Sequence, residues 1–310
     1  MNSVRKKRRV LIHGLYYCGR MLAEHLNGGD WEFRYYRDSG LNNLAAMARE
    51  LAACDLVYQI GGRRTAGKFL CAAKLLSKKK IVMHWTGSDT LLEQDRGPEA
   101  STARWVMQDI HHWAVSQWIG QEVAGLGVSC DWVPIPSFYV PEAPAPLPQD
   151  FSVLVYVPGV RCGDLYGLDR ILQVAKSLPE IRFNLVGFVQ GRIPNPPSNL
   201  KIHGRLPDLR DFYHRSSVVW RPSRHDGLSC MVMEGLGYGR HVMWTYPFPG
   251  CLQVQSAEEA HDHIARLNEL QKRRQLQLNA DGPRSLAQEG YLPSHLKQVI
   301  LQRLQAIAEA

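Results

Sequence analysis

The chain has 310 residues, of which 45% are hydrophobic and 21% charged. These proportions are close to globular averages and exclude a disordered, collagen-like or coiled-coil chain, and the length predicts roughly two domains. The 37 basic and 29 acidic side chains give a formal net charge of +8, which favours anionic partners without choosing among them.

The cysteines and the N-terminus indicate the compartment. Seven cysteines are scattered without a C-x-x-C pair or a neighbouring histidine at metal-ligand spacing, which predicts reduced thiols and a cytoplasmic protein. The basic residues 5–9 and the apolar run after them resemble a signal peptide, but His13 and Gly14 interrupt that run. No stretch reaches the ~18 apolar residues of a spanning helix.

In the first half of the chain, short β-branched or aromatic runs alternate with helical periodicities, the pattern of parallel strands joined by crossover helices. Helices are expected over 41–54 and 65–77. The expected strands are 8–14, 31–37, 55–61, 79–85, 112–116 and 130–137.

The second half repeats this alternation, and the tail from Ser256 is almost wholly helical. The expected helices are 167–179, 208–217 and 227–239. The expected strands are 151–159, 181–187, 200–206, 217–223 and 241–246.

A proline-rich segment, PEAPAPLP over 141–148, separates the halves. We therefore predict an α/β fold with two Rossmann-like domains, 1–150 and 151–310, joined by a linker over about 138–150. The last amphipathic stretch, 295–310, is expected to cross back onto the first domain. Open parallel sheets bind ligands beyond the carboxyl ends of their strands, so the sequence predicts a site in a cleft between facing domains.

The segment from Trp220 to Trp244 is the most informative part of the sequence. It presents a strand, a polar turn with Asp226, a glycine at 227, a helix that carries Glu234, and a further strand. The first amides of that helix, at Leu228, Ser229 and Cys230, are candidates to hold a diphosphate. A carboxylate in an apolar helix needs a partner, and a vicinal diol such as a ribose would satisfy Glu234.

This segment resembles the GT-B nucleotide-sugar glycosyltransferases, specifically the retaining family 4 (GT4), whose signature is glutamate, seven residues, glutamate after a proline–serine strand end. PSRHDGLSCMVMEGLGYGRHV matches it, with Asp226 in place of the first glutamate. The strand VLVYVPG and YGLDRILQVAKSLP resemble the family's glycine–arginine loop and helix, LKIHGRLPDLRDFYHRSSVVWRPS its nucleobase loop, and HWTGSD its histidine loop. The resemblance covers nearly the whole chain.

The resemblance implies a set of site residues. On the donor side, Gly159 and Arg161 would meet the diphosphate together with Gly227 and the amides of residues 228–230, Glu234 the ribose, Asp226 the sugar, and Arg205 the base. The first-domain glycine loop is reduced to HGLYYCGR, with Gly14 as its candidate contact. The implied catalytic set is Asp226, Glu234, Arg161 and His84.

On the acceptor side, His84 is a candidate for a sugar hydroxyl contact or an ordinary core histidine, and Asp89 either positions the acceptor hydroxyl or caps a helix. The family commonly has a lysine five residues after the loop arginine, where this chain has Tyr166. Another cation, Arg224 or Arg221, would then substitute, or donor binding is weaker.

The implied activity is transfer of a sugar from a nucleoside diphosphate to an acceptor hydroxyl, with retention. No Asp-x-Asp pair occurs, so neither a metal nor another cofactor is expected. The alternatives are a nucleotide-sugar epimerase or phosphorylase of the same fold, and a non-catalytic sugar-nucleotide or membrane-binding homologue.

The basic clusters 5–9 and 78–80 are interpreted as a solvated rim before two buried strands, or as peripheral contact with an anionic membrane. A nucleic-acid partner is not expected, because the basic runs lack interleaved aromatic residues and no helix-turn-helix or zinc pattern appears.

Overall fold

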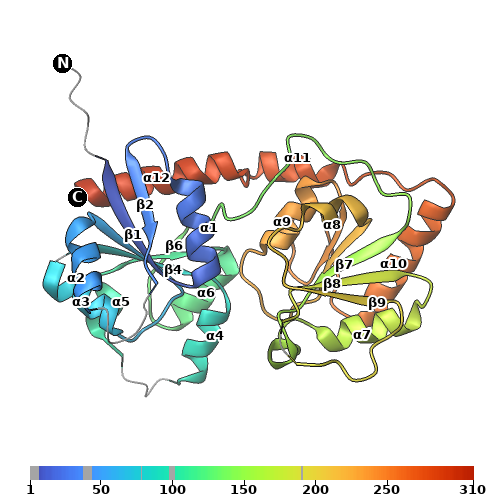
Figure 1. Ribbon diagram of the computed structural model, residues 1–310, viewed down its shortest axis with the longest axis horizontal. Helices are drawn as coiled ribbons and strands as arrows, with labels where there is room; N and C mark the ends of the chain where they lie inside the picture. The colour runs from blue at the N-terminus through green and yellow to red at the C-terminus, as the bar shows by residue number, and fades with distance from the viewer. Residues whose placement is uncertain (1–6, 38–43, 78, 98–101, 190) are drawn as a thin grey trace. The chain divides into compact units, whose positions relative to one another are not determined.

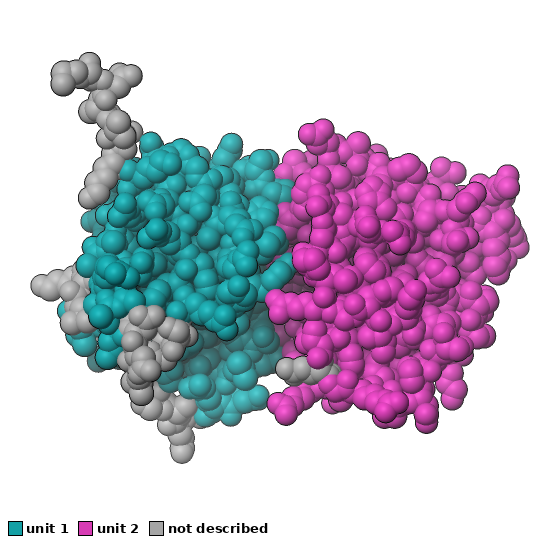
Figure 2. Space-filling model, viewed as in Figure 1, with its two compact units in different colours: residues 1–137, 293–310 teal, residues 138–292 magenta. Residues whose placement is uncertain are grey.

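A computed structural model describes residues 7–37, 44–77, 79–97, 102–189 and 191–310. The chain forms two compact units, coloured separately in Figure 2. Unit 1 runs up to Ser137 and also includes Pro293–Ala310, and unit 2 is Phe138–Leu292. The sequence had placed the boundary near Asp150.

Unit 1 is built on a sheet in which all neighbouring strands are parallel, in the order β2-β1-β3-β4-β5-β6. Apolar residues fill β1, β3 and β4 because the sheet is covered on both faces. Within the described residues the strands are β1 Arg8–Gly14, β2 Trp31–Tyr35, β3 Leu56–Ile60, β4 Lys80–Trp85, β5 His111–Ala114 and β6 Asp131–Trp132.

Helices cover this sheet, and the last helix of the chain is one of them (Figure 1). Lys80 Nζ donates to Ile307 O at 2.8 Å and Arg303 pairs with Asp131 at 2.9 Å, which ties this last helix to the strands. The helices are α1 Tyr16–Leu26, α2 Leu44–Ala53, α3 Lys68–Ser77, α4 Ser88–Asp95, α5 Arg104–Gln108, α6 Gln117–Gly125 and α12 Pro293–Glu309.

Unit 2 holds a second all-parallel sheet in the order β12-β11-β10-β7-β8-β9. The three-residue edge strand β12 is too short to produce a sequence signal, and the sequence did not predict it. The strands are β7 Ser152–Tyr156, β8 Arg182–Val186, β9 Leu200–Gly204, β10 Val218–Arg221, β11 His241–Trp244 and β12 Cys251–Gln253.

Helices α7 and α10 lie on one face of this second sheet, and α8 and α9 lie on the other (Figure 1). A buried cluster that includes Val155, Ile171, Phe183 and Ile264 fills the space under α7 and α10. The helical segments are η2 Val160–Cys162, α7 Leu168–Ser177, α8 Arg210–Arg215, α9 Cys230–Gly237, α10 Ala257–Lys272 and α11 Asp281–Gln288.

The proline-rich segment lies along unit 2. Buried Arg240 donates from Nη2 to Ala145 O and Pro146 O, and Gln271 Nε2 donates to Pro148 O. These bonds assign residues 138–150 to unit 2, and a proline-rich chain that offers carbonyls without amides suits such acceptors.

The predicted α/β class, with two Rossmann-like domains and a C-terminal helix that returns to the first, is confirmed. In each sheet the strand order reverses at one point, between β1 and β3 in unit 1 and between β7 and β10 in unit 2. Ligands of open parallel sheets bind at such switch points, beyond the carboxyl ends of the strands. In the described ranges, no helix is long and apolar enough to cross a membrane.

Candidate functional site

The loop that follows β7 brings Arg161 to the switch point of unit 2. The chain leaves β7 through Val157 and Gly159 and forms the short helix η2, on which Arg161 is exposed. Its guanidinium makes no hydrogen bond or ion pair with any residue that the structure describes. A charge-bearing side chain at this place is available to an anionic ligand.

The loop that follows β10, the neighbouring strand, holds a buried ion pair. Arg221 Nε donates to Asp226 Oδ2 at 2.6 Å, and Ser223 Oγ donates to the same oxygen at 3.0 Å. The two charged side chains are only 7% and 13% exposed. The Asp226 carboxylate is therefore committed to its own loop on at least one oxygen.

Two tyrosine rings face the guanidinium of this pair. The Arg221 Cζ atom lies 4.6 Å from the ring centroid of Tyr166 and 5.2 Å from that of Tyr156. Burial lowers the pKa of Arg221, but Asp226 and the two tyrosines raise it, with a net result above the ordinary value. Arg221 is thus a permanent buried cation beside Tyr166.

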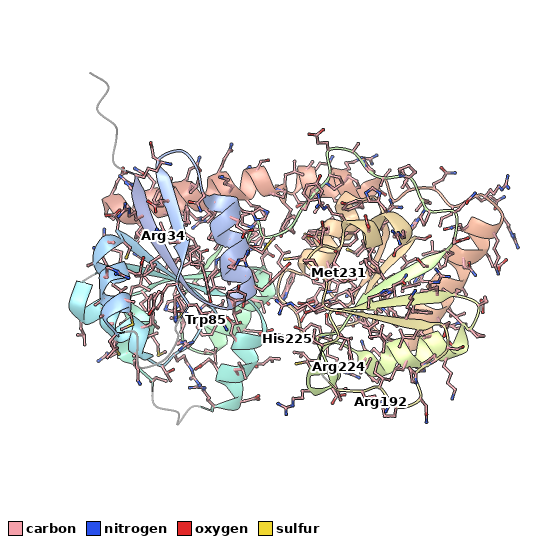
Figure 3. All side chains as sticks on the ribbon, in the orientation of Figure 1. Arg34, Trp85, Arg192, Arg224, His225 and Met231 are labelled. Carbon is pink, nitrogen blue, oxygen red and sulfur yellow. The ribbon has the colours of Figure 1, made fainter. Side chains whose placement is uncertain are left out.

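Arg224, which Figure 3 labels, lies in the same loop but pairs with other residues. Its Nη1 and Nη2 donate to the two carboxylate oxygens of Asp169 at 3.1 and 2.6 Å, and Nη1 also donates to Asp164 O. This bidentate pair holds the loop after β7 against the loop after β10. It leaves Arg224 few donors for a ligand.

Helix α9 begins directly after these residues. Gly227 is buried, and Ser229 is the N-cap without a side-chain capping bond. The first amides of a helix have no partner within the helix, so those around Leu228, Ser229 and Cys230 lie at the end where an anion is stabilised. Diphosphate binding by these amides stays a prediction.

Glu234 lies one turn further along α9. Its carboxylate accepts a hydrogen bond from Tyr213 Oη at 2.6 Å and another from the Tyr139 amide at 3.1 Å. Burial raises the pKa of Glu234 to about 7, the two hydrogen bonds lower it in part, and Asp208 raises it further. The sequence indicated that Glu234 needs a partner but did not point to Tyr213, which carried no signal beyond its place in an amphipathic helix.

The expected base-edge residue, Arg205, follows β9 in an exposed loop. The residue before it, Gly204, has a φ of +70°. The Gly187 amide donates to Gly204 O at 2.7 Å, which fixes the start of this loop beside β8.

In unit 1, Gly14 lies at the switch point and packs closely against β3. It ends β1 with a φ of +114°, and a Cβ atom there would lie 1.9 Å from Ile60 O of β3. Tyr35 Oη donates to Gly14 O at 2.7 Å. Gly14 therefore packs against its own sheet, which accounts for the glycine without a ligand.

His84 is fully buried within β4. Its Nδ1 atom lies 2.6 Å from Tyr58 Oη, and its ring meets Trp113 edge to face. Burial lowers the pKa of His84 to about 3, partly offset by the Val133 backbone. The packing supports the core interpretation and does not support the expected contact with a sugar hydroxyl.

The Asp89 carboxylate also makes its hydrogen bonds inside unit 1. Its carboxylate accepts from the amides of Gly62, Thr86 and Gly87 at 2.5–3.1 Å, and it is 7% exposed. Burial raises the pKa of Asp89, and the amide hydrogen bonds lower it in part. Asp89 thus joins the start of α4 to the end of β3, but it lies in the first turn of α4 and is not its N-cap, which is Gly87.

Three described members of the basic clusters contact unit 1 itself. Arg8 Nη1 donates to Gln305, Arg9 pairs with Glu32 at 3.1 Å, and Lys80 donates to α12. Residues 5, 6 and 78 lie outside the described part of the chain. Membrane contact stays a prediction.

No group of three or more His, Cys, Asp or Glu side chains in the described ranges is arranged to hold a metal ion. The expected independence from metal and cofactor stays a prediction.

No protein-family model and no curated protein sequence matches this chain. Solved structures do match it. HepE from Anabaena in complex with UDP-glucose is 11% identical with a TM-score of 0.70, over 96% of this chain and 99% of that one. Sucrose-phosphate synthase from Thermosynechococcus elongatus is 11% identical with a TM-score of 0.70, over 98% and 100%.

A variant of TarM from S. aureus, in complex with fondaparinux, alpha-GlcNAc-glycerol and UDP, is 11% identical with a TM-score of 0.64. The match covers 86% of this chain but only 59% of the TarM chain. At such identities the likeness concerns the fold. Together with the two parallel sheets it shows that the chain has the GT-B fold of two Rossmann-like domains.

Proposed function

We propose that this chain is a glycosyltransferase that moves a sugar from a nucleoside diphosphate to an acceptor hydroxyl. One observation carries the proposal: Arg161 after β7, the N-terminus of α9 after β10, and Glu234 on α9 gather at the switch point of one parallel sheet. This combination offers a cation, helix amides and a diol acceptor, the three contacts that a nucleoside diphosphate requires.

In this proposal unit 2 binds the donor. Arg161 and the amides around Leu228 and Ser229 hold the diphosphate, Glu234 accepts from the ribose, and Arg205 contacts the base. The proposal draws support from HepE, which was solved with UDP-glucose. We take UDP sugars as the first donors to test.

The chemistry is a substitution at the anomeric carbon. The bond from C1 to the diphosphate oxygen breaks, a bond from C1 to the acceptor oxygen forms, and the acceptor proton passes to the departing phosphate. Arg161 and the helix amides stabilise the charge that develops on the leaving group. We further propose the retaining, GT4-like course that the sequence resemblance implies, without a metal ion.

We place the acceptor on unit 1, but at residues other than His84 and Asp89, the two that the sequence analysis selected. His84 and Asp89 are buried, whereas Leu15, Tyr16 and Tyr17, just after the carboxyl end of β1, are 44–54% exposed. Exposed apolar and aromatic side chains at a switch point are typical of a binding surface.

The test is a turnover screen of UDP, GDP, ADP and dTDP sugars with and without a panel of glycosides, each in the absence and in the presence of excess EDTA. Release of the nucleoside diphosphate that needs an acceptor supports transfer. Isomerised donor without acceptor indicates the epimerase alternative, a sugar phosphate product indicates a phosphorylase, and binding without consumption indicates a non-catalytic homologue. Loss of activity in EDTA would contradict the metal-free mechanism.

A further inference from the structure

Arg221 leaves most of its donors unused although it is buried. A guanidinium carries five N–H groups, and here only the one on Nε makes a hydrogen bond, to Asp226. The four on Nη1 and Nη2 have no hydrogen-bond partner among the residues that the structure describes. The side chain is only 7% exposed, but neither Nη1 nor Nη2 is among the described buried atoms that lack a partner, so both nitrogens remain accessible to solvent and to a ligand.

The surroundings hold this guanidinium in one position. Asp226 Oδ2 fixes Nε, Ser223 Oγ fixes the same carboxylate oxygen, and the rings of Tyr156 and Tyr166 lie on the cation. Cation–π contact restrains the plane of a guanidinium without using its N–H groups. These contacts orient the Arg221 guanidinium and leave Nη1 and Nη2 without a hydrogen bond to any described residue.

The position is that of the missing lysine. Arg221 is the last residue of β10 and Tyr156 the last of β7, so both lie at the carboxyl edge where the sheet order reverses. The loop with Arg161 and Tyr166 closes onto the same edge, since a Cβ on Gly167 would lie 2.3 Å from Pro222 O. Arg224, the other candidate to replace the lysine, uses both terminal nitrogens in hydrogen bonds to Asp169 and Asp164.

We propose that Arg221 is the second cation for the donor diphosphate, and that Asp226 and Tyr166 are positioning residues that hold it in place. In this chain the positive charge comes from the end of β10, and Tyr166, at the lysine position, supplies an aromatic face for it. Asp226 then acts on the diphosphate through Arg221 and does not read the sugar. The inference rests on the proposed function, because it concerns the same donor.

The first test compares the affinities for UDP and UMP by calorimetry. Arg221→Gln is expected to weaken UDP binding by roughly ten- to a hundredfold, the size of a charge-assisted bond, and UMP binding by less than about threefold. Arg182→Gln is the matched control, because Arg182 is an exposed arginine at the opposite end of the parallel strands. Equal losses for UDP and UMP, or no loss, would overturn the assignment of Arg221.

A second variant guards against misfolding. Arg221→Gln alone leaves a buried carboxylate without its partner, whereas Arg221→Gln with Asp226→Asn removes both charges and keeps the shapes. The folded double variant is expected to lose the same preference for UDP over UMP. Retention of the wild-type preference would refute the proposal. Tyr166→Lys added to Arg221→Gln is expected to restore part of the UDP affinity.

Asp226→Asn separates a positioning role from a sugar contact. A positioning residue lowers UDP and UDP-glucose affinity by the same factor, because both ligands carry the diphosphate. A loss confined to UDP-glucose would show that Asp226 reads the sugar and would refute its positioning role. If the wild-type protein binds none of UDP, GDP, ADP and dTDP, the proposed function fails and this inference fails with it.

Discussion

The switch points of the two units have opposite character although they arise from the same kind of sheet. In unit 1 the polar groups bond to one another: His13 Nδ1 lies 2.7 Å from Gln59 Oε1, Gln59 Nε2 donates to Ile60 O, and the Leu15 amide also donates to Ile60 O. In unit 2, Arg161 has no partner among described residues, and Arg221 has one bond out of five. In unit 1 the buried Nε of Arg63, after β3, also lacks a partner among the described residues. The loop after β1 is therefore closed by its own hydrogen bonds, whereas both loops at the switch point of unit 2 carry unused cationic donors.

This difference identifies function better than residue type does. The sequence offers a glycine, a histidine and an aspartate at the edge of unit 1 that look as suitable as the residues of unit 2. The amide hydrogen bonds of Asp89 and the close packing of Gly14 show that these two are satisfied inside the unit, and a satisfied buried group gains little from a ligand. His84 is buried against Tyr58 and Trp113, although its Nε2 lacks a partner among the described residues. We expect the ligand at the edge of unit 2, where both switch-point loops carry unused cationic donors.

The largest expected effect concerns the closed edge. Gly14→Ala should destabilise unit 1 by at least about 3 kcal/mol, because a Cβ would overlap Ile60 O at 1.9 Å and the φ of +114° strains any other residue. Gly29→Ala is the matched control, since its φ is +58° and nothing lies within 4 Å of the added atom, so about 1 kcal/mol is expected. Thermal unfolding of both variants measures the difference, and equal losses would mean that the edge of unit 1 is not tightly closed.

The open edge is tested next through Arg161. Arg161→Ala should weaken UDP binding by roughly ten- to a hundredfold, which corresponds to about 1.5–3 kcal/mol for a charge-assisted hydrogen bond. The melting temperature should not change, because the exposed side chain contacts no described polar partner. An unchanged UDP affinity in calorimetry would show that Arg161 is not part of the donor site.

Asp89 provides the counterpart on unit 1. Asp89→Asn places an amide group among backbone N–H donors and should reduce the free energy of unfolding by about 1–3 kcal/mol. UDP affinity should stay at the wild-type value, since the carboxylate is consumed within unit 1. A folded, stable variant with weaker nucleotide binding would show that the closed edge also takes part in donor recognition.

The smallest effect is a pH dependence from Glu234, whose pKa is raised to about 7. A ribose hydroxyl is bound best by the ionised carboxylate, so affinity for UDP-glucose should rise by up to about tenfold between about pH 6 and pH 8. UDP-glucose is the chosen probe because its phosphodiester groups do not titrate in that range. Glu234→Gln should abolish the rise, and a rise that persists in this variant would assign it to another group.

The raised pKa also affects stability, with a defined sign. The folded state binds a proton on Glu234 more tightly than the unfolded chain does, so this group contributes stability at low pH that is lost as the pH rises from about 4.5 to about 7. Ligand affinity and intrinsic stability therefore respond to pH in opposite directions, which separates them experimentally.

The sequence predicted the fold, and the position of Asp226 in a loop and of Glu234 on a helix, because both depend on local patterns. Alternating strands and helices predicted two Rossmann-like domains, and the spacing of Asp226 and Glu234 around a glycine placed them on one loop and one helix. It could not predict that Arg240 and Gln271 hold the proline-rich segment against unit 2, because that depends on contacts between distant residues.

At the candidate functional site, too, the sequence could not decide which side chains reach a ligand. Nothing local distinguishes Arg221 from Arg224, three residues apart, yet one is buried against tyrosines and the other pairs with Asp169 at the surface. The sequence placed His84 near the end of an expected strand and left open a sugar contact or a core position, and the structure buries it in β4 against Trp113. Only the packing of neighbouring strands decides which side chains reach a ligand.

Amide hydrogen exchange with and without UDP tests the difference between the two edges most directly. UDP is expected to protect most strongly the amides of 159–163 and 227–234 in unit 2, while those of 61–62 and 86–90 in unit 1 change little. Protection that is strongest at the edge of unit 1, or that is absent from both edges at saturating UDP, would contradict the assignment of the donor site to unit 2.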